Sequence, residues 1–183
     1  MRHFWIWSGV LAAGLFWGGT ALAQPAKKWS TASDVLAVGL PAVAGAISYA
    51  KSDIQGLEQL AISQAMALAS SGLLKGVVDA PRPNGQDHHS FPSRHTAVAF
   101  SAASYLDLRY GEELGNWRPV LYSAAGLAGI GRVQAREHRW VDVLGGATLG
   151  YGLSSFGVKP LQQGRLTVLP TPGSMWLAWQ QSF

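Results

Sequence analysis

Two apolar runs flank the stretch Gly131-Arg-Val-Gln-Ala-Arg-Glu-His-Arg-Trp-Val-Asp142, and neither run, 119–131 or 143–158, contains Asp, Glu, Lys or Arg. Because Ala and Leu favour the helical state, each run predicts a helix, and the charged stretch becomes the loop between them. Three earlier runs have the same composition: 35–50, 59–74 and 96–106. The pattern therefore predicts an all-α fold, an up-and-down bundle of about five helices.

His138 and Asp142 are four residues apart within this charged stretch. If a helix begins near Arg139, the carboxylate lies within reach of the imidazole and can fix its tautomer. One ring nitrogen is then free to act as a nucleophile, and a nucleophilic histidine needs such an orienting carboxylate. Arg132 offers a planar fork suited to bidentate phosphate binding. An ordinary His–Asp pair at a solvated helix start is the alternative interpretation.

Loops that alternate along an up-and-down bundle lie at the same end of it. Loops 75–95 and 131–142 are therefore expected at one end, and loops 51–58 and 107–118 at the other. The first pair of loops contains the candidate phosphate-handling side chains: Lys75, Arg82, Ser93, Arg94, His95, Arg132, His138 and Asp142. A cationic pocket with two histidines suits phosphoryl transfer, in which catalysis is largely charge stabilisation and positioning.

Composition places this domain near a membrane rather than on nucleic acid. The 183 residues form one domain, with 48% hydrophobic and only 13% charged residues, against roughly 25% charged in soluble domains. The net charge of +4 comes from Lys and Arg that are spread along the chain, so an anionic small group or lipid head is favoured over nucleic acid. Without Cys, the chain has neither a disulfide framework nor a thiolate metal site.

The first residues, 1–23, have the form of an export signal. A short positive region precedes the apolar run 4–22, and Ala21-Leu-Ala23 has the small-x-small form of a signal-peptidase site. An uncleaved first membrane helix is the alternative, because the apolar run is nearly long enough to span a bilayer. Residues 25–33 are expected to be a short polar lead-in to the helical domain, 24–158.

The charge-free segments themselves are short, since none reaches the roughly 20 residues that span a bilayer comfortably. They are expected to be short spans with polar ends or the core of a soluble bundle. Gly146 and Gly150 form a small-xxx-small pattern that permits close helix contact. The tail, 159–183, contains two β-prone runs separated by Pro and Gly, which predicts a small hairpin.

Three motifs in a fixed order resemble the signatures of a known family. They are Lys75-Gly-Val-Val-Asp-Ala-Pro-Arg82-Pro83, then Phe91-Pro-Ser-Arg-His95, then Arg132 with His138 and Asp142 at the family's spacing. Together they make the region 59–158 similar to the type 2 phosphatidic acid phosphatase and vanadium haloperoxidase superfamily. Each motif alone is weak, but three on loops at helix ends are specific.

The resemblance implies an all-α bundle and a metal-independent hydrolase that works through a phosphohistidine. By this likeness His138 attacks phosphorus, Asp142 orients it and His95 protonates the leaving oxygen. The phosphoryl oxygens are then held by the backbone of the second motif and by Lys75, Arg82, Ser93 and Arg132. No cofactor and no metal are expected.

Two positions depart from the family pattern. Arg94 stands where the second motif usually has Gly, which tolerates unusual φ and permits close approach to phosphate, so Arg94 is expected either to adopt the same backbone or to shift the loop. It is also expected to add a cation to the site. Gly131 stands where the third motif usually has Ser, which removes one hydroxyl donor.

Three further polar residues in loop 75–95 receive simpler interpretations. His88 and His89 are expected to be solvated rather than metal ligands, because no third ligand at suitable spacing accompanies them. Asp79, between Lys75 and Arg82, is expected to pair with a neighbouring cation.

The leading hypothesis is a phosphatase of the bacterial cell envelope acting on a phosphorylated membrane lipid such as a phosphatidate, phosphatidylglycerophosphate, isoprenyl diphosphate or lipid A. It is expected in the inner membrane with its active site facing the periplasm. A soluble periplasmic acid phosphatase acting on small phosphoesters is the alternative, and a catalytically inactive membrane binding protein is a third hypothesis.

Overall fold

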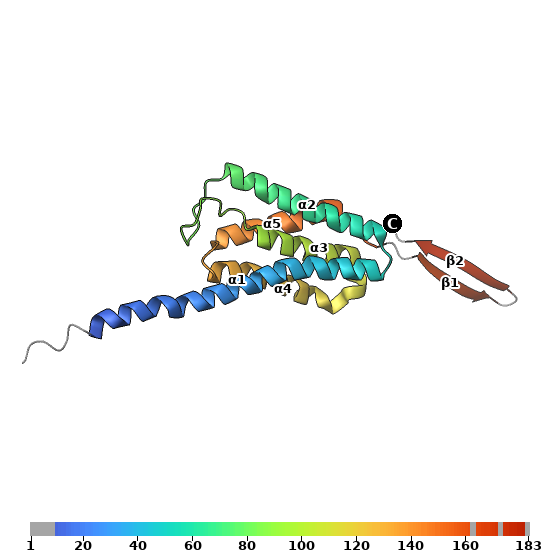
Figure 1. The fold of residues 1–183 in the computed structure, drawn as a ribbon. Helices are drawn as coiled ribbons and strands as arrows, with labels where there is room; N and C mark the ends of the chain where they lie inside the picture. Colours follow the sequence, from blue (N-terminus) through green and yellow to red (C-terminus); the bar gives the residue numbers. More distant parts are fainter. Residues whose placement is uncertain (1–9, 162–163, 172–173, 182–183) are drawn as a thin grey trace, which may run out of the picture.

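The protein is described by a computed structural model that covers residues 10–161, 164–171 and 174–181, with side chains over 25–161. Its elements in chain order are α1 (Val10–Ala50), α2 (Ile54–Val77), α3 (Arg94–Leu114), the 3-10 helix η1 (Gly115–Trp117), α4 (Arg118–Gln134), α5 (Trp140–Gly157), β1 (Gly164–Thr171) and β2 (Ser174–Gln181). Figure 1 shows a helical bundle with a strand hairpin extending from one end. The predicted all-α bundle is confirmed, and so is the hairpin, in which Gly164 pairs with Gln181 and Thr171 with Ser174.

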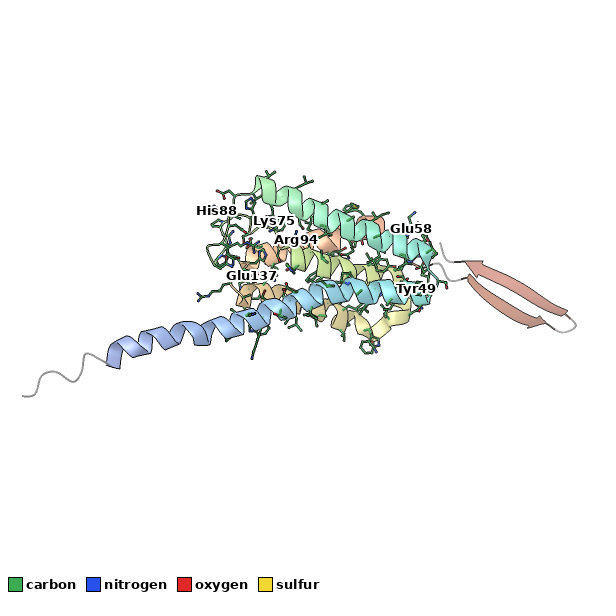
Figure 2. All side chains as sticks on the ribbon, in the orientation of Figure 1. Tyr49, Glu58, Lys75, His88, Arg94 and Glu137 are labelled. Carbon is green, nitrogen blue, oxygen red and sulfur yellow. The ribbon has the colours of Figure 1, made fainter. Side chains whose placement is uncertain are left out.

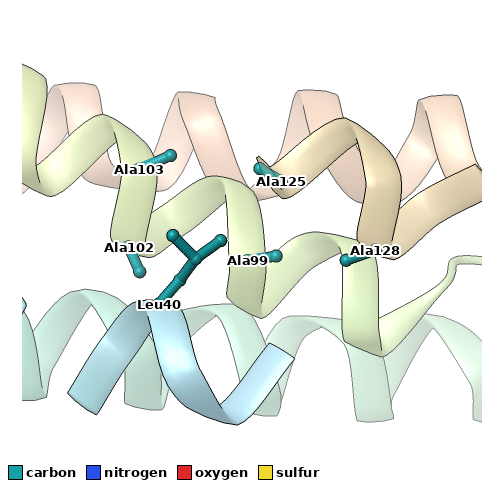
Figure 3. Packing of buried hydrophobic residues seen from close by; sticks show 6 residues of the cluster. All are labelled: Leu40, Ala99, Ala102, Ala103, Ala125 and Ala128. Atoms are coloured by element: carbon teal, nitrogen blue, oxygen red, sulfur yellow. The ribbon is translucent and has the colours of Figure 1, made fainter. Parts of the chain in front are cut away.

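Helix α3 is the centre of the bundle and contacts α1, α2, α4 and α5. Its core contacts are made by small residues. Ala99, Ala102 and Ala103 of α3 pack against Leu40 of α1 and against Ala125 and Ala128 of α4 (Figure 3). Because alanine adds little bulk, these helices approach closely, which holds the loops at both ends of α3 in place.

Gly146 and Gly150 of α5 face α3, as the small-xxx-small pattern predicted. A Cβ atom on Gly150 would overlap the carbonyl oxygen of Ala97, and one on Gly146 would overlap that of Ser93. The second contact places the start of α5 directly against the start of α3. Glycine at these two positions therefore brings the second and third motifs together.

Replacing Gly150 with alanine should destabilise the fold by about 1–3 kcal/mol, because α5 must move away from α3 to admit the methyl group. Gly152→Ala is the matched control, since a Cβ atom there meets nothing within 4 Å. The control should stabilise by up to about 1 kcal/mol through helix propensity. Unfolding free energies measure both changes, and a loss of similar size in the two variants would contradict the proposed close contact.

The helices are longer than the charge-free segments suggested. Helix α2 has 24 residues and α3 has 21, because each helix continues into charged residues at its ends. The expectation that no segment reaches spanning length was therefore wrong. Residues 25–50 and 54–77 are long and apolar enough to cross a membrane, and only 22% of the apolar stretch of each helix is buried in the protein.

The N-terminal segment is a continuous part of α1 from Val10 onward. Residues 25–33 are helical, so the expectation of a polar lead-in was wrong. Cleavage after Ala23 remains a prediction, and residues 1–9 of the expected signal lie outside the described part of the chain.

The two ends of the bundle differ as predicted. Figure 2 shows Lys75, His88, Arg94 and Glu137 gathered at one end, while Glu58 lies at the opposite end. At that opposite end, Asp53 caps α2 and accepts two hydrogen bonds from Arg109, at 2.6 and 2.8 Å. This buried pair joins the α1–α2 turn to α3 at the end of the bundle opposite the motif loops.

Candidate active site

The loop between α2 and α3 folds back on itself and then docks onto α5. Ala80 N–H donates to the carbonyl of His88 at 2.9 Å, and Ser90 N–H donates to the carbonyl of Ala80 at 2.9 Å. Ser93 N–H then donates to the carbonyl of Asp142 at 2.8 Å. These backbone bonds place the first two motifs beside the third.

A tight turn after α4 directs His138 into the same place. Arg136 has a left-handed backbone with φ of 58°, and the N–H groups of Glu137 and His138 both donate to the carbonyl of Arg132, at 3.0 and 3.3 Å. Helix α5 then begins at Trp140, so the condition of a helix start near Arg139 is met. The turn therefore keeps His138 next to Arg132, although six positions separate them.

His138 and Asp142 lie together, and Ser90 lies between them. The distance from His138 Nδ1 to Asp142 Oδ2 is 3.8 Å, which is too long for a hydrogen bond. Ser90 Oγ lies 3.4 Å from His138 Nδ1 and donates to Asp142 Oδ2 at 2.5 Å. The carboxylate also accepts from Arg139 N–H at 2.7 Å. The expected direct contact is thus replaced by one through a fully buried serine hydroxyl.

Both histidines are held in the neutral form. Burial, followed by the charges of Arg82 and Lys75, lowers the pKa of His138 to about 3. Burial and then the charge of Arg132 lower the pKa of His95 to about 4, although nearby Asp34 opposes the change. A neutral His138 keeps a lone pair available for attack at ordinary pH.

These shifts predict a loss of stability in acid. The unfolded chain binds a proton at His138 near pH 6.5, whereas the folded chain does so only near pH 3, so unfolding becomes easier as the pH falls through this window. Between pH 7 and pH 5 the expected cost is about 2 kcal/mol for this group. His138→Gln should remove that part of the decrease when unfolding free energies are compared at the two pH values. Equal decreases in the two proteins would contradict the shift.

Cationic side chains near His138 come from the last turns of α2 and α4 and from the loop after α2. Arg82 is half-buried, and its Nη1 lies 3.5 Å from the carbonyl of Glu137, while its Nε donates to Asp87 at 2.8 Å. Lys75 Nζ donates to the carbonyl of Ser90 at 3.3 Å. Two helix ends and one loop therefore bring Lys75, Arg82 and Arg132 near the buried imidazole.

One expectation for the neighbouring loop residues turns out differently. Asp79 contacts His88 at 2.8 Å instead of a lysine or arginine, and Asp87 is the partner of Arg82. His88 is otherwise solvated, as expected, with 67% of its side chain exposed.

Arg132 is the most buried cation of the site. Its Nη1 donates to Asp34 at 2.8 Å, and its Nη2 contacts the Glu137 carboxylate. Its Nε is buried and has no hydrogen-bond partner among the described residues. Since an unsatisfied buried donor is costly, this N–H is a candidate ligand for an anion.

A family model for the PAP2 superfamily matches residues 57–163, a range that contains the three motifs and the buried histidines. The chain belongs to the PAP2 superfamily. This confirms the resemblance to the type 2 phosphatidic acid phosphatases.

Several PAP2 proteins are similar to this chain. A lipid A 1-phosphatase of Porphyromonas gingivalis is 33% identical over 106 residues, which are 54% of this chain and 23% of that protein. A lipid A 4′-phosphatase of Helicobacter pylori is 30% identical over 131 residues, which are 63% of this chain and 62% of that protein. The chain thus spans less than two thirds of the length of either relative. The crystal structure of Aquifex aeolicus LpxE has a TM-score of 0.52 and 23% identity, covers 68% of this chain and 84% of that chain, and shows that the fold is shared.

The second PAP2 motif forms the start of α3. Ser93 is the N-cap, and its buried hydroxyl accepts from Thr96 Oγ1 at 2.9 Å. Its phosphate-binding role stays a prediction. Arg94 is the first helical residue, and its backbone does not adopt a positive φ. Arginine therefore replaces the usual glycine without backbone strain, and its exposed side chain adds positive charge that lowers the pKa of His95.

Gly131, the departure in the third PAP2 motif, has a packing explanation. A Cβ atom on Gly131 would lie 2.9 Å from Ser33 Cβ and 2.9 Å from the carbonyl oxygen of Trp29. A serine side chain would therefore push α1 away from the end of α4. The glycine allows α1 to lie against the site.

Three residues at the site were missed by sequence reasoning: Ser90, Glu137 and Asp34. Ser90 directly precedes the second motif and Glu137 lies within the third, so both could have been considered as neighbours of named residues. Asp34 lies 98 positions before Arg132, outside the PAP2 match, and no sequence spacing connects the two. Its carboxylate also lies 2.9 Å from His95 Nε2.

Proposed function

We propose that this protein is a phosphatase that hydrolyses a phosphomonoester or diphosphate through a phosphohistidine at His138. The observation that carries the proposal is a buried, neutral imidazole beside a cluster of cations, one of which has a buried donor without a partner. A neutral nitrogen can attack phosphorus while fixed positive charges stabilise the charge on the phosphoryl oxygens.

The contact through Ser90 supports attack by the Nε2 atom. Since His138 Nδ1 faces Ser90 and Asp142, the other ring nitrogen is left for phosphorus. A bond forms between Nε2 and phosphorus as the bond from phosphorus to the leaving oxygen breaks. His95 protonates that oxygen, and then takes a proton from the water that cleaves the phosphohistidine and releases orthophosphate.

His95 needs a proton for the first of these steps. Burial and Arg132 oppose protonation in the free site, where the pKa of His95 is about 4. A bound phosphate dianion adds negative charge beside Arg132 and His95, and so favours the imidazolium. Substrate binding therefore raises the pKa of His95, so that the imidazolium needed for the general acid forms more easily.

An apolar groove beside the site favours a lipid substrate. It has a volume of about 470 Å³ between α2 and α5, and its lining includes Leu74, Phe91, Leu149, Gly152, Leu153 and Phe156. Leu74 and Phe91 are the chain neighbours of Lys75 and Ser90, so the groove begins beside residues of the site. An acyl chain fits a surface of this chemistry, and the similar proteins named for lipid A support the same class.

Phosphate release from paired substrates tests the proposal. Hydrolysis of a lipid phosphate in detergent and of a water-soluble phosphomonoester should be compared with excess chelator present. We expect hydrolysis of the lipid to persist and to be faster than that of the soluble ester. Gly152→Phe fills the open groove and should slow only the lipid reaction. No hydrolysis of either substrate would reject the phosphatase, while equal rates unaffected by Gly152→Phe would favour the soluble acid phosphatase. Loss of activity with chelator, restored by a divalent metal, would reject the metal-free mechanism.

We also propose that α1 and α2 lie in the inner membrane, with the motif loops facing the periplasm. Most of the apolar stretch of each helix is not covered by the rest of the protein, and Val38, Leu68 and Leu73 are among the exposed apolar side chains. Extended apolar surface of this kind is unusual for a soluble monomer. Release of the protein by osmotic shock without detergent would reject insertion.

A further inference from the structure

One carboxylate oxygen lies between the two groups that the proposed reaction assigns to opposite sides of the scissile bond. Asp34 Oδ1 is 2.8 Å from Arg132 Nη1 and 2.9 Å from His95 Nε2. In the proposed reaction, Arg132 holds the phosphoryl group and His95 protonates the leaving oxygen. An oxygen that contacts both occupies a place that a substrate oxygen needs.

Helix α1 is brought to this place by the glycine of the third motif. Because Gly131 has no side chain, the turn of α1 that contains Trp29 and Ser33 lies directly on α4, and Ser33 Oγ donates to the carbonyl of Ala128 at 2.7 Å. Asp34 follows Ser33 in that turn. The position of its carboxylate therefore depends on packing along α1 rather than on the motif loops.

Asp34 differs from the other carboxylate on Arg132. Glu137 has only 18% of its side chain exposed, and Ser30 Oγ donates to it at 2.7 Å. Asp34 is 53% exposed, so its side chain can rotate away from Arg132 and His95 without movement of the helix. Glu137 is therefore a fixed counter-ion of Arg132, whereas Asp34 is replaceable.

We propose, on the basis of the function proposed above, that Asp34 competes with the phosphoryl group for Arg132 and His95 and so weakens the binding of orthophosphate. A carboxylate and a phosphate cannot share these donors without like-charge repulsion. Substrate must displace Asp34, and the returning carboxylate helps to expel the product. With Lys75, Arg82, Arg94 and Arg132 near one another, such a competitor limits product inhibition.

Orthophosphate binding to the purified full-length protein tests this role without a need for turnover. Isothermal titration should give a dissociation constant that is lower by about tenfold or more in Asp34→Ala, since one competing charge-assisted hydrogen-bond acceptor is removed. Asp34→Asn should also bind more tightly, because it loses the charge. Asp79→Asn is the matched control: it makes the same charge change in the motif loop, and its carboxylate contacts His88 rather than Arg132. It should bind orthophosphate as the unchanged protein does.

The kinetics give a second readout. With an aryl phosphate, the inhibition constant of orthophosphate should fall in Asp34→Ala by the same factor as the dissociation constant. Unchanged or weaker orthophosphate binding in a folded Asp34→Ala protein would overturn the competitor role. A lower kcat with unchanged binding would also overturn it, because it would make Asp34 a partner of His95 in proton transfer.

A double variant separates this inference from the proposed function. Arg132→Ala in the Asp34→Ala background should abolish the gained affinity if phosphate binds at Arg132. If Asp34→Ala binds no more tightly but Arg132→Ala still weakens binding, the phosphate site stands and the role of Asp34 fails. If Arg132→Ala changes nothing in either background, the phosphate site itself is wrong, and both proposals fail with it.

Discussion

Replacing His138 with alanine is expected to abolish turnover for every substrate. The imidazole is 3% exposed and is oriented by Ser90 and Asp142, and no neighbouring group can take over as a nucleophile in that position. His95→Ala should behave differently. A general acid contributes about 10²–10⁴-fold, and an alkyl or lipid leaving group needs its proton. A nitrophenolate needs little protonation, so the loss with an aryl phosphate should be much smaller.

His88→Ala is the control for both variants. It removes a histidine from the same end of the bundle, but that side chain is 67% exposed and contacts Asp79. Rates of phosphate release from alkyl and aryl substrates should therefore match those of the unchanged protein. Equal losses in His95→Ala across all leaving groups would show that His95 is not the acid.

The intermediate itself can be located in the His95→Ala protein. With a good leaving group the phosphohistidine should still form, but no base remains to activate the water that hydrolyses it. Acid-labile phosphate should then accumulate and map to His138 after quenching. Phosphate on another residue would contradict the assignment of the nucleophile.

Removing one partner of the buried pair between Asp53 and Arg109 is expected to cost about 3–5 kcal/mol of unfolding free energy, because the remaining charge stays buried. The side chains are only 5% and 3% exposed. Asp53 also accepts from Tyr110 at 2.7 Å, and Arg109 donates to the carbonyl of Lys159 at 2.9 Å. The pair therefore connects the α1–α2 turn, α3 and the segment after α5.

Chemical unfolding of Asp53→Asn, Arg109→Ala and the double variant measures this effect. The double variant should lose less than the sum of the single losses, since neither charge is then left alone. Arg118→Ala is the control: its contact with Asp107 is 2.6 Å, but its side chain is 52% exposed, so a loss of about 0–1 kcal/mol is expected. Losses for Asp53→Asn no larger than this would mean that the pair does not hold the fold.

The sequence alone determined the class of fold, the order of the helices and which loops share an end of the bundle. Composition and loop length suffice for these, because Ala-rich runs favour helices and short loops reverse the chain. The proximity of His138 and Asp142 was expected on the condition that a helix begins near Arg139, and α5 begins at Trp140. Helix lengths were underestimated because charged residues at helix ends were excluded from the runs.

Only the tertiary structure placed α1 in the site. The contacts of Asp34 with His95 and Arg132 depend on the close packing of α1 against Gly131, which no local pattern encodes. The same is true of Ser90, whose hydroxyl separates two residues that helical spacing placed in direct contact. Spacing along the chain decides which residues share a face of a helix. The group that packs between two such residues, here the Ser90 hydroxyl, comes from another segment of the chain and is decided by tertiary packing.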